Sequence, residues 1–151
     1  MFESNNFATS LYDMGMKNNL MIFDVGAHKG QTSSHFYKLF PKSFIHAFEP
    51  SSTLFSELKK NLSLRRQIRC HNFGLGESDE DAFLTRPSSD LCGQIIREPT
   101  QNSSSVSVRR LDGFCKLEKI SLINLLKIDV EGNELSVLKG SLSMIDRNAI
   151  K

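Results

Sequence analysis

Residues 20–25 form a continuous apolar run that contains Asp24 near its end, and a glycine turn follows at once. Such a run is typical of a strand buried on both faces of a sheet. Apolar residues at helical spacing follow the turn, and Pro41 marks the end of that helix. This strand–turn–helix unit constrains the chain to an α/β fold with a parallel sheet.

The same pattern recurs along the chain. Further strands are expected at 44–48, 68–73 and 123–129, and further helices at 51–62, 112–119 and 135–142. Residues 82–110 break the rhythm, because short strands at 82–85 and 106–108 enclose a polar stretch that reads as a long loop. Strands that alternate with helices predict a mostly parallel sheet with flanking helices and right-handed crossovers.

The chemically distinctive residues fall at the carboxyl ends of the expected strands. They are residues 24–30, Glu49, residues 72–76 and residues 129–132. In an open parallel sheet these ends share one edge, and ligands bind there. Four acidic or glycine-containing turns at that edge therefore predict a ligand site.

Gly26 and Gly30 lie in the first of these turns. Glycine adopts positive φ and lets a ligand approach the backbone, so this turn suits a nucleotide-type site, although it also suits an ordinary strand-to-helix turn. Glu49 ends the next strand, about 20 residues further on, where an acid accepts the ribose hydroxyls in dinucleotide folds. The alternative is a surface glutamate before Pro50.

The first turn departs from the dinucleotide fingerprint, because His28 stands where the middle glycine belongs. No compact cradle for a pyrophosphate is therefore indicated. S-adenosylmethionine has no phosphates and carries an ammonium, a carboxylate and a sulfonium. Asp24 would help to hold its positively charged amino-acid part, directly or through water. A nicotinamide-binding oxidoreductase is the alternative that this departure disfavours.

Five motifs follow one another in a characteristic order and spacing. They are Asp24-Val25-Gly26-Ala27-x-x-Gly30, Phe48-Glu49-Pro50, Asn72-x-Gly74-Leu75-Gly76, Leu111-Asp112, and Leu126-Lys127-Ile128-Asp129-Val130-Glu131-Gly132-x-Glu134-x-x-Val137-Leu138-Lys139-Gly140. Across residues 20–140 they resemble the FkbM-family methyltransferases, and the last motif is the most diagnostic. His28 stands where family members usually have asparagine, so the resemblance assigns its side chain no role.

The resemblance implies a Rossmann-like class I methyltransferase fold that binds S-adenosylmethionine. It assigns Asp24, Gly26, Ala27 and Gly30 to the methionine end of the cofactor, Glu49 to the ribose, Asn72 and Gly74 to the adenine, and Asp129 to the surroundings of the methyl group. Characterised family members are mostly O-methyltransferases that act on sugars or secondary metabolites. The expected reaction is therefore O-methylation of such a hydroxyl.

Methyl transfer to a hydroxyl requires a group that makes the acceptor oxygen more nucleophilic. Asp129 and Glu131 are the candidate catalytic acids, and Glu134 ranks behind them because it is expected to point along its helix. Complementing the helix dipole explains Glu131 equally well. Binding of a divalent metal by Asp129 and Glu131 is an open alternative, but two acids in one turn do not by themselves predict a metal site. A further alternative is a module that binds the cofactor without turnover.

Residues 20–151 are expected to form the cofactor-binding domain, preceded by a polar lead-in at 1–19. Class I methyltransferases resemble one another in having seven strands in the order 3-2-1-4-5-7-6, and the pattern here reaches only the fourth core strand. That strand would form an apolar edge, which natural proteins avoid. The resulting predictions are a fold truncated after the fourth core strand and self-association through the uncovered edge.

Composition limits the remaining partners. The 151 residues carry a formal net charge of +2, and the three cysteines are widely spaced without a Cys/His ligand pattern. A basic cluster at 59–69 suits a helix end better than a nucleic-acid surface. Neither a signal-peptide core nor an apolar stretch of about 20 residues is present. We therefore expect a cytoplasmic protein with a small-molecule acceptor and no nucleic-acid or membrane partner.

Overall fold

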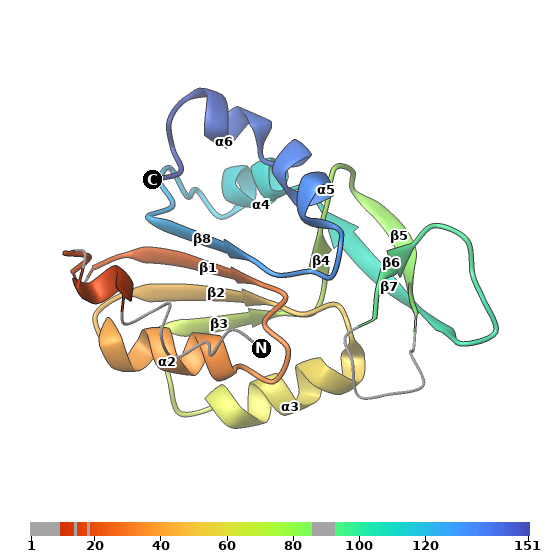
Figure 1. The fold of residues 1–151 in the computed structure, drawn as a ribbon, viewed down its shortest axis with the longest axis horizontal. Helices are drawn as coiled ribbons and strands as arrows, with labels where there is room; N and C mark the ends of the chain where they lie inside the picture. The colour runs from red at the N-terminus through yellow and green to blue at the C-terminus, as the bar shows by residue number, and fades with distance from the viewer. Residues whose placement is uncertain (1–9, 14, 18, 86–92) are drawn as a thin grey trace.

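The computed structural model describes residues 10–13, 15–17, 19–85 and 93–151. Its main sheet contains four parallel strands, β1 (Met21–Val25), β2 (Phe44–Phe48), β3 (Ile68–His71) and β8 (Leu125–Ile128), in the spatial order β3-β2-β1-β8 (Figure 1). In this register Ile22 of β1 lies between Ile45 of β2 and Leu125 of β8. The predicted α/β fold with a parallel sheet is confirmed.

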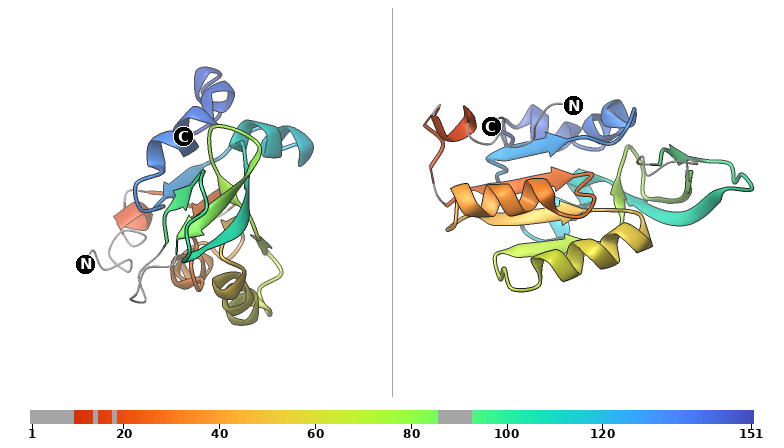
Figure 2. Two further views of the ribbon diagram at one scale, coloured as in Figure 1. Left: turned by 90° about the vertical axis from the view of Figure 1, so that its right-hand side faces the viewer. Right: turned by 60° about the horizontal axis from the view of Figure 1, so that its bottom comes forward.

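Helices cover both faces of the main sheet. They are α2 (Gln31–Leu39) and α3 (Ser52–Leu62) on one face, and α4 (Leu111–Leu117), α5 (Glu134–Lys139) and α6 (Leu142–Asp146) on the other (Figures 1 and 2). Because side chains alternate along a strand, Ile22 packs in the core beneath α2 and α3, and Phe23 packs in the core beneath the other three helices. Each face of the sheet therefore has its own hydrophobic core.

A second sheet lies at the carboxyl ends of the main strands (Figures 1 and 2). Its strands are β4 (Gly74–Leu75), β5 (Glu80–Thr85), β6 (Ile95–Ile96) and β7 (Ser103–Arg109), in the order β4-β7-β5-β6. The expected long loop between 85 and 106 is therefore wrong where β6 and the start of β7 form strands, whereas 86–92 lie outside the described residues. Serines open β7 without an apolar signal, and pairing with β5 defines the strand.

Tertiary contacts change the ends of several expected elements. The third strand stops at His71 rather than residue 73, because the chain turns there into the second sheet. The helix expected over 135–142 is split at Gly140, where an added Cβ would lie 1.9 Å from the carbonyl oxygen of Gly76. Asp112 lies inside α4 rather than capping it, and its carboxylate accepts the N–H groups of Ser143 and Met144 at the start of α6.

The last residues of the chain run beside the beginning of the fourth core strand. Ile123 and Ile150 form a parallel bridge, in which the Ile123 N–H donates to Ala149 O at 2.8 Å and the Lys151 N–H donates to Ile123 O at 3.0 Å. The contact has the direction expected of a neighbouring fifth strand. None of the helices that the structure describes is long and apolar enough to cross a lipid bilayer.

Candidate cofactor-binding and active site

The turn after β1 is held against both neighbouring strands. The N–H groups of Gly26 and Ala27 donate to the Phe48 carbonyl at 3.1 and 2.9 Å. Gly26 has a φ of 78°, and an added Cβ would lie 2.0 Å from the carbonyl oxygen of Asp129. Glycine is therefore required there by its conformation and by the close approach of the chain after β8.

Gly30 and Ala27 shape this turn by packing. Gly30 begins α2 with a φ of 89°, and an added Cβ would press on the side chains of Leu58 and Leu62 in α3. Ala27 is buried in the same core. Both predicted residues thus support the turn from the side of the helices, and neither lines the cavity described below.

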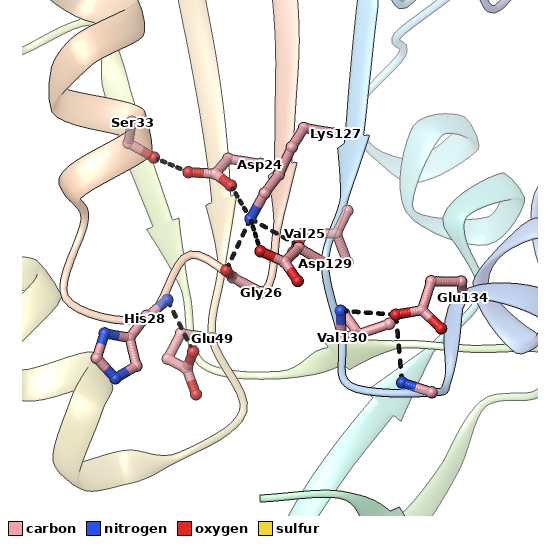
Figure 3. A network of polar contacts seen from close by, with 11 residues as sticks. Asp24, Val25, Gly26, His28, Ser33, Glu49, Lys127, Asp129, Val130 and Glu134 are labelled. Carbon is pink, nitrogen blue, oxygen red and sulfur yellow. Dashed lines mark hydrogen bonds and ion pairs between the residues drawn. The ribbon is translucent and has the colours of Figure 1, made fainter. Parts of the chain in front are cut away.

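Asp24 is completely buried beneath the turn. The Ser33 hydroxyl donates to its Oδ2 at 2.7 Å, and the Lys127 ammonium lies 3.0 Å from its Oδ1 (Figure 3). Within the described residues, this ion pair is the contact that compensates the charge on Oδ1. Asp24 therefore lies next to the predicted site, with its charge directed to Lys127.

Lys127 connects the two strands that meet at the site. Its side chain is 14% exposed, and its Nζ donates to the carbonyl of Gly26 at 3.1 Å. The same ammonium lies 3.7 Å from Oδ2 of Asp129 (Figure 3). A single lysine on β8 thus contacts the buried acid of β1, the glycine turn and the acid that follows β8.

Glu49 lies at the carboxyl end of β2 and is 6% exposed. Its Oε2 accepts the N–H of His28 at 2.9 Å, and its Oε1 accepts the N–H of Ser51 at 2.8 Å. Burial raises the pKa of the Glu49 carboxyl, and these two hydrogen bonds partly oppose that effect. The carboxylate is therefore held in one orientation at the edge of the sheet (Figure 3).

Asn72 and Gly74 follow β3 but have different surroundings. The Asn72 amide donates to the carbonyls of Glu49 and Pro50 at 3.0 and 3.1 Å, so it secures the turn that carries Glu49. Gly74 lines the cavity, and an added Cβ would lie 2.9 Å from Cδ1 of Ile95. Of these two predicted residues, only Gly74 therefore faces the space available to a ligand.

The turn after β8 carries both candidate catalytic acids. The Asp129 side chain is 69% exposed, and Glu131 is exposed as well. Glu131 has a φ of 52° and Gly132 a φ of 100°, so two consecutive residues adopt the left-handed conformation. Glu134 does not point along its helix as expected, because its Oε1 accepts the N–H groups of Val130 and Gly132, each at 3.2 Å (Figure 3).

These turns enclose a cavity between the main sheet and the second sheet. Its walls include Gly26, Glu49 and Gly74, together with Asp129 and Glu131. The structure thus brings together predicted residues from four separate strand ends. Asp24, Ala27, Gly30 and Asn72 support this lining from outside it.

Three lining residues in or next to the second sheet were not predicted from the sequence. They are Leu84, Gly93 and Ile95, which close the cavity opposite the main sheet. The apolar pair Ile95–Ile96 inside a polar stretch is the one signal that could have indicated a strand there. Lys127 stands in the last motif but received no predicted role. Its position inside an otherwise apolar strand was a signal for a buried partner.

The charges around the cavity are predominantly negative. Glu49, Asp129 and Glu131 contribute carboxylates to the lining, whereas the nearby ammonium of Lys127 is already paired with Asp24. A cavity of this sign favours a cationic ligand. Within the part of the chain that the structure describes, no three His, Cys, Asp or Glu side chains are arranged to hold a metal ion.

The sequence matches a known enzyme family over most of its length. The domain model described as "Methyltransferase FkbM domain" matches residues 24–151. The chain is 29% identical over 140 residues to "2-O-methyltransferase NoeI" of Sinorhizobium fredii, covering 80% of this chain and 56% of that protein. It is 28% identical over 121 residues to "Hexuronic acid methyltransferase AglP" of Haloferax volcanii, covering 80% of this chain and 49% of that protein.

A solved structure shares the fold. The crystal structure of methyltransferase FkbM from Methylobacillus flagellatus superposes with a TM-score of 0.65 at 21% identity, covering 87% of this chain and 31% of that one. The chain spans about half the length of the two curated relatives. The family match, the shared fold and these relatives agree, and the chain belongs to the FkbM methyltransferase family.

Proposed function

We propose that the cavity binds S-adenosylmethionine and that the chain contributes the cofactor site of an O-methyltransferase. The observation that carries the proposal is the Glu49 carboxylate, which is buried, lines the cavity and is oriented by two backbone N–H groups. Each carboxylate oxygen accepts one of these bonds and keeps a further lone pair. Two neighbouring ribose hydroxyls are the donors that such an acceptor suits.

The rest of the cavity agrees with this ligand. Phe48, Leu75 and Ile95 supply apolar walls near Gly74, and such walls suit the apolar faces of an adenine ring. The acids Asp129 and Glu131 suit the positive sulfonium and ammonium groups. In this proposal Asp24 acts at the methionine end by holding Lys127, and Gly26, Ala27, Gly30 and Asn72 maintain the turns around the ligand.

The proposed chemistry divides between the ligand and the protein. S-adenosylmethionine supplies, when bound, a methyl group activated for transfer by its sulfonium. The chain aligns this group with the acceptor hydroxyl and excludes water. Asp129 or Glu131 would accept the hydroxyl proton as the carbon–oxygen bond forms and the methyl carbon–sulfur bond breaks, with S-adenosylhomocysteine as the leaving group, because both exposed carboxylates lie at the cavity.

A sugar hydroxyl is the acceptor that we propose. One relative is named as a 2-O-methyltransferase and another as a hexuronic acid methyltransferase, which supports transfer to an oxygen of a sugar-like acceptor. The oxidoreductase alternative lacks such support, because the family match is to a methyltransferase domain. A module that binds the cofactor without turnover is the alternative that an assay must separate.

Transfer of a radiolabelled methyl group from S-adenosylmethionine tests the proposal, with glucose and glucuronic acid as probe acceptors. We expect label in the sugar fraction from the parent protein and at least tenfold less from Asp129→Asn combined with Glu131→Gln. Binding of S-adenosylhomocysteine without label transfer to either probe would favour the non-catalytic module. Failure to bind either form of the cofactor would contradict the proposed function.

A further inference from the structure

Glu134 is bonded to the turn that precedes it. Its Oε1 accepts the N–H groups of Val130 and Gly132, so one carboxylate oxygen bridges both ends of the turn formed by residues 130–132 (Figure 3). Bonds from backbone N–H groups, its own first, lower the pKa of the Glu134 carboxyl. The group is therefore charged at neutral pH while it holds the turn.

This turn needs an external support because of its backbone conformation. Glu131 has a φ of 52°, in the left-handed region that side chains other than glycine rarely occupy. Such conformations persist where surrounding contacts enforce them, and they gather at functional sites. Glu134 supplies contacts on both sides of Glu131, because its two donors are the residues immediately before and after it.

Asp129, which precedes this turn, is held by contacts that do not involve Glu134. The Asp129 N–H donates to the carbonyl of Val25 at 3.1 Å, and Lys127 lies 3.7 Å from the Asp129 carboxylate. Asp129, Val130 and Glu131 all line the cavity. Relaxation of residues 130–132 would therefore change how Glu131 is placed relative to Asp129 at the cavity.

We propose that Glu134 is a positioning residue whose carboxylate oxygen holds residues 130–132 in the conformation that presents Asp129 and Glu131 to the cofactor cavity. The inference rests on the proposed function of that cavity. Its competitor is a simpler role, in which Glu134 is a negative charge in the first turn of α5 and complements the helix dipole. The two roles make opposite demands on the side chain.

Two conservative variants separate these roles. Glu134→Gln keeps an Oε1 acceptor at the same distance from the backbone and loses the charge, whereas Glu134→Asp keeps the charge and shortens the reach. A positioning role predicts that Gln preserves the turn and Asp loses it. A dipole role predicts that Asp is tolerated and that Gln is the damaging change. Glu118→Ala is the control, because this acid pairs with Arg69 away from the cavity lining.

Amide hydrogen exchange and calorimetry with S-adenosylhomocysteine provide the readouts. In Glu134→Asp, we expect the Val130 and Gly132 amides to exchange at least tenfold faster and the dissociation constant to rise at least fivefold. Glu134→Gln and Glu118→Ala should stay within twofold of the parent in both measurements. The inference would be overturned if Glu134→Asp exchanged its Val130 and Gly132 amides as slowly as the parent. It would also be overturned if Glu134→Gln exchanged them as fast as Glu134→Asp.

The same experiment distinguishes this inference from the proposed function. If the parent protein does not bind S-adenosylhomocysteine, the proposed function fails, and the amide exchange alone then tells whether Glu134 holds the turn. If the parent binds and Glu134→Asp binds equally well, the proposed function stands and the positioning role fails.

Discussion

Asp24 and Lys127 form a largely buried ion pair. Asp24 is 0% exposed, and Lys127 is the cation that compensates its Oδ1 at 3.0 Å. Removing one partner of a buried ion pair leaves an uncompensated charge, which costs far more than the pair itself contributes. The pair also joins β1 to β8 directly beneath the glycine turn, so its loss affects the cavity as well as stability.

Lys127→Met should therefore lower the free energy of unfolding by about 3–5 kcal/mol. The double variant Asp24→Asn with Lys127→Met should recover a large part of that loss, because it removes the charge that the single variant leaves buried. Urea unfolding at neutral pH measures both. A single variant that unfolds at the same urea concentration as the parent would show that the ion pair is not what neutralises Asp24.

Sequence spacing predicts the position of a site residue well when that position depends only on the end of the strand that the residue follows. Glu49 is placed at the cavity by its position after β2, and Gly74 by its position after β3. Asp24 differs, because its partner Lys127 comes from a strand more than a hundred residues away, and spacing carries no information on that contact. The Glu134 side chain points back toward the preceding turn and accepts its N–H groups, a contact that helical periodicity does not predict.

At the scale of elements, the break between α5 and α6 is set by a close contact. Gly140 lies against the chain after β4, and an added Cβ would stand 1.9 Å from the Gly76 carbonyl oxygen. Gly113 inside α4 offers a contrast, because its nearest neighbouring atom would be 3.9 Å from an added Cβ. Periodic leucines predicted one helix over 135–142, whereas the structure has two, with Gly140 at the break and the Asp112 carboxylate bonded to the first N–H groups of α6.

Alanine at these two glycines should change stability in opposite directions. Gly140→Ala should lower the free energy of unfolding by about 2 kcal/mol or more, because backbone must move to accommodate the new methyl group. Gly113→Ala should raise it by about 0.5–1 kcal/mol, the usual gain from alanine over glycine inside a helix. Thermal unfolding of both variants measures this, and a neutral Gly140→Ala would mean that the chain at Gly76 can move away from Gly140 at little cost.

β2 and β3 share a histidine pair inside an aromatic cluster. His46 Nδ1 lies 2.9 Å from His71 Nε2, and the two rings stack beside Phe48 and Phe114. Burial, with smaller contributions from the neighbouring His71 and Arg69, lowers the pKa of His46 to about 4. Burial also lowers the pKa of His71 to about 4, with Glu118 acting in the opposite direction.

These shifts predict a stability that falls in acid. Between pH 6.5 and about 4 the unfolded chain binds protons at both histidines while the folded chain does not, so acid favours unfolding. The free energy of unfolding should drop by roughly 2–4 kcal/mol across this window, after allowing for residual solvent contact. His46→Phe with His71→Phe should flatten that part of the profile in urea unfolding. An unchanged slope would show that the pair does not cause it.

At the scale of the whole molecule, two sheets meet at the site. The main sheet could be read from its apolar strands, because burial on both faces leaves a strong signal. In the second sheet the sequence predicted only parts of β5 and β7, at 82–85 and 106–108. The rest was missed because β7 begins with serines and β6 has only two residues, so long-range pairing defines them. That sheet supplies Leu84 and Ile95 to the cavity wall, and the sequence-based prediction included neither residue in the site.

Self-association through the edge of the fourth core strand stays a prediction, and exposed apolar side chains on α5 and α6 offer a second surface for it. Leu135, Leu138, Leu142 and Ile145 are 65%, 40%, 51% and 39% exposed along α5 and α6. Light scattering should show a mass that rises with concentration, and Leu135→Lys with Leu142→Lys should reduce it. Leu64→Lys is the control, because Leu64 is 93% exposed near the end of α3 on the other face. A parent that stays monomeric would contradict the prediction.

Calorimetric titration of the parent chain with S-adenosylhomocysteine and with NAD tests the central claim most directly. We predict binding of S-adenosylhomocysteine in preference to NAD, since the cavity is acidic and the turn lacks the middle glycine of a dinucleotide site. Glu49→Ala should weaken that binding by about 1.5–3 kcal/mol, the range for hydrogen bonds to a charged group. Tighter binding of NAD, or an unchanged dissociation constant in Glu49→Ala, would contradict the assignment of this cavity to S-adenosylmethionine.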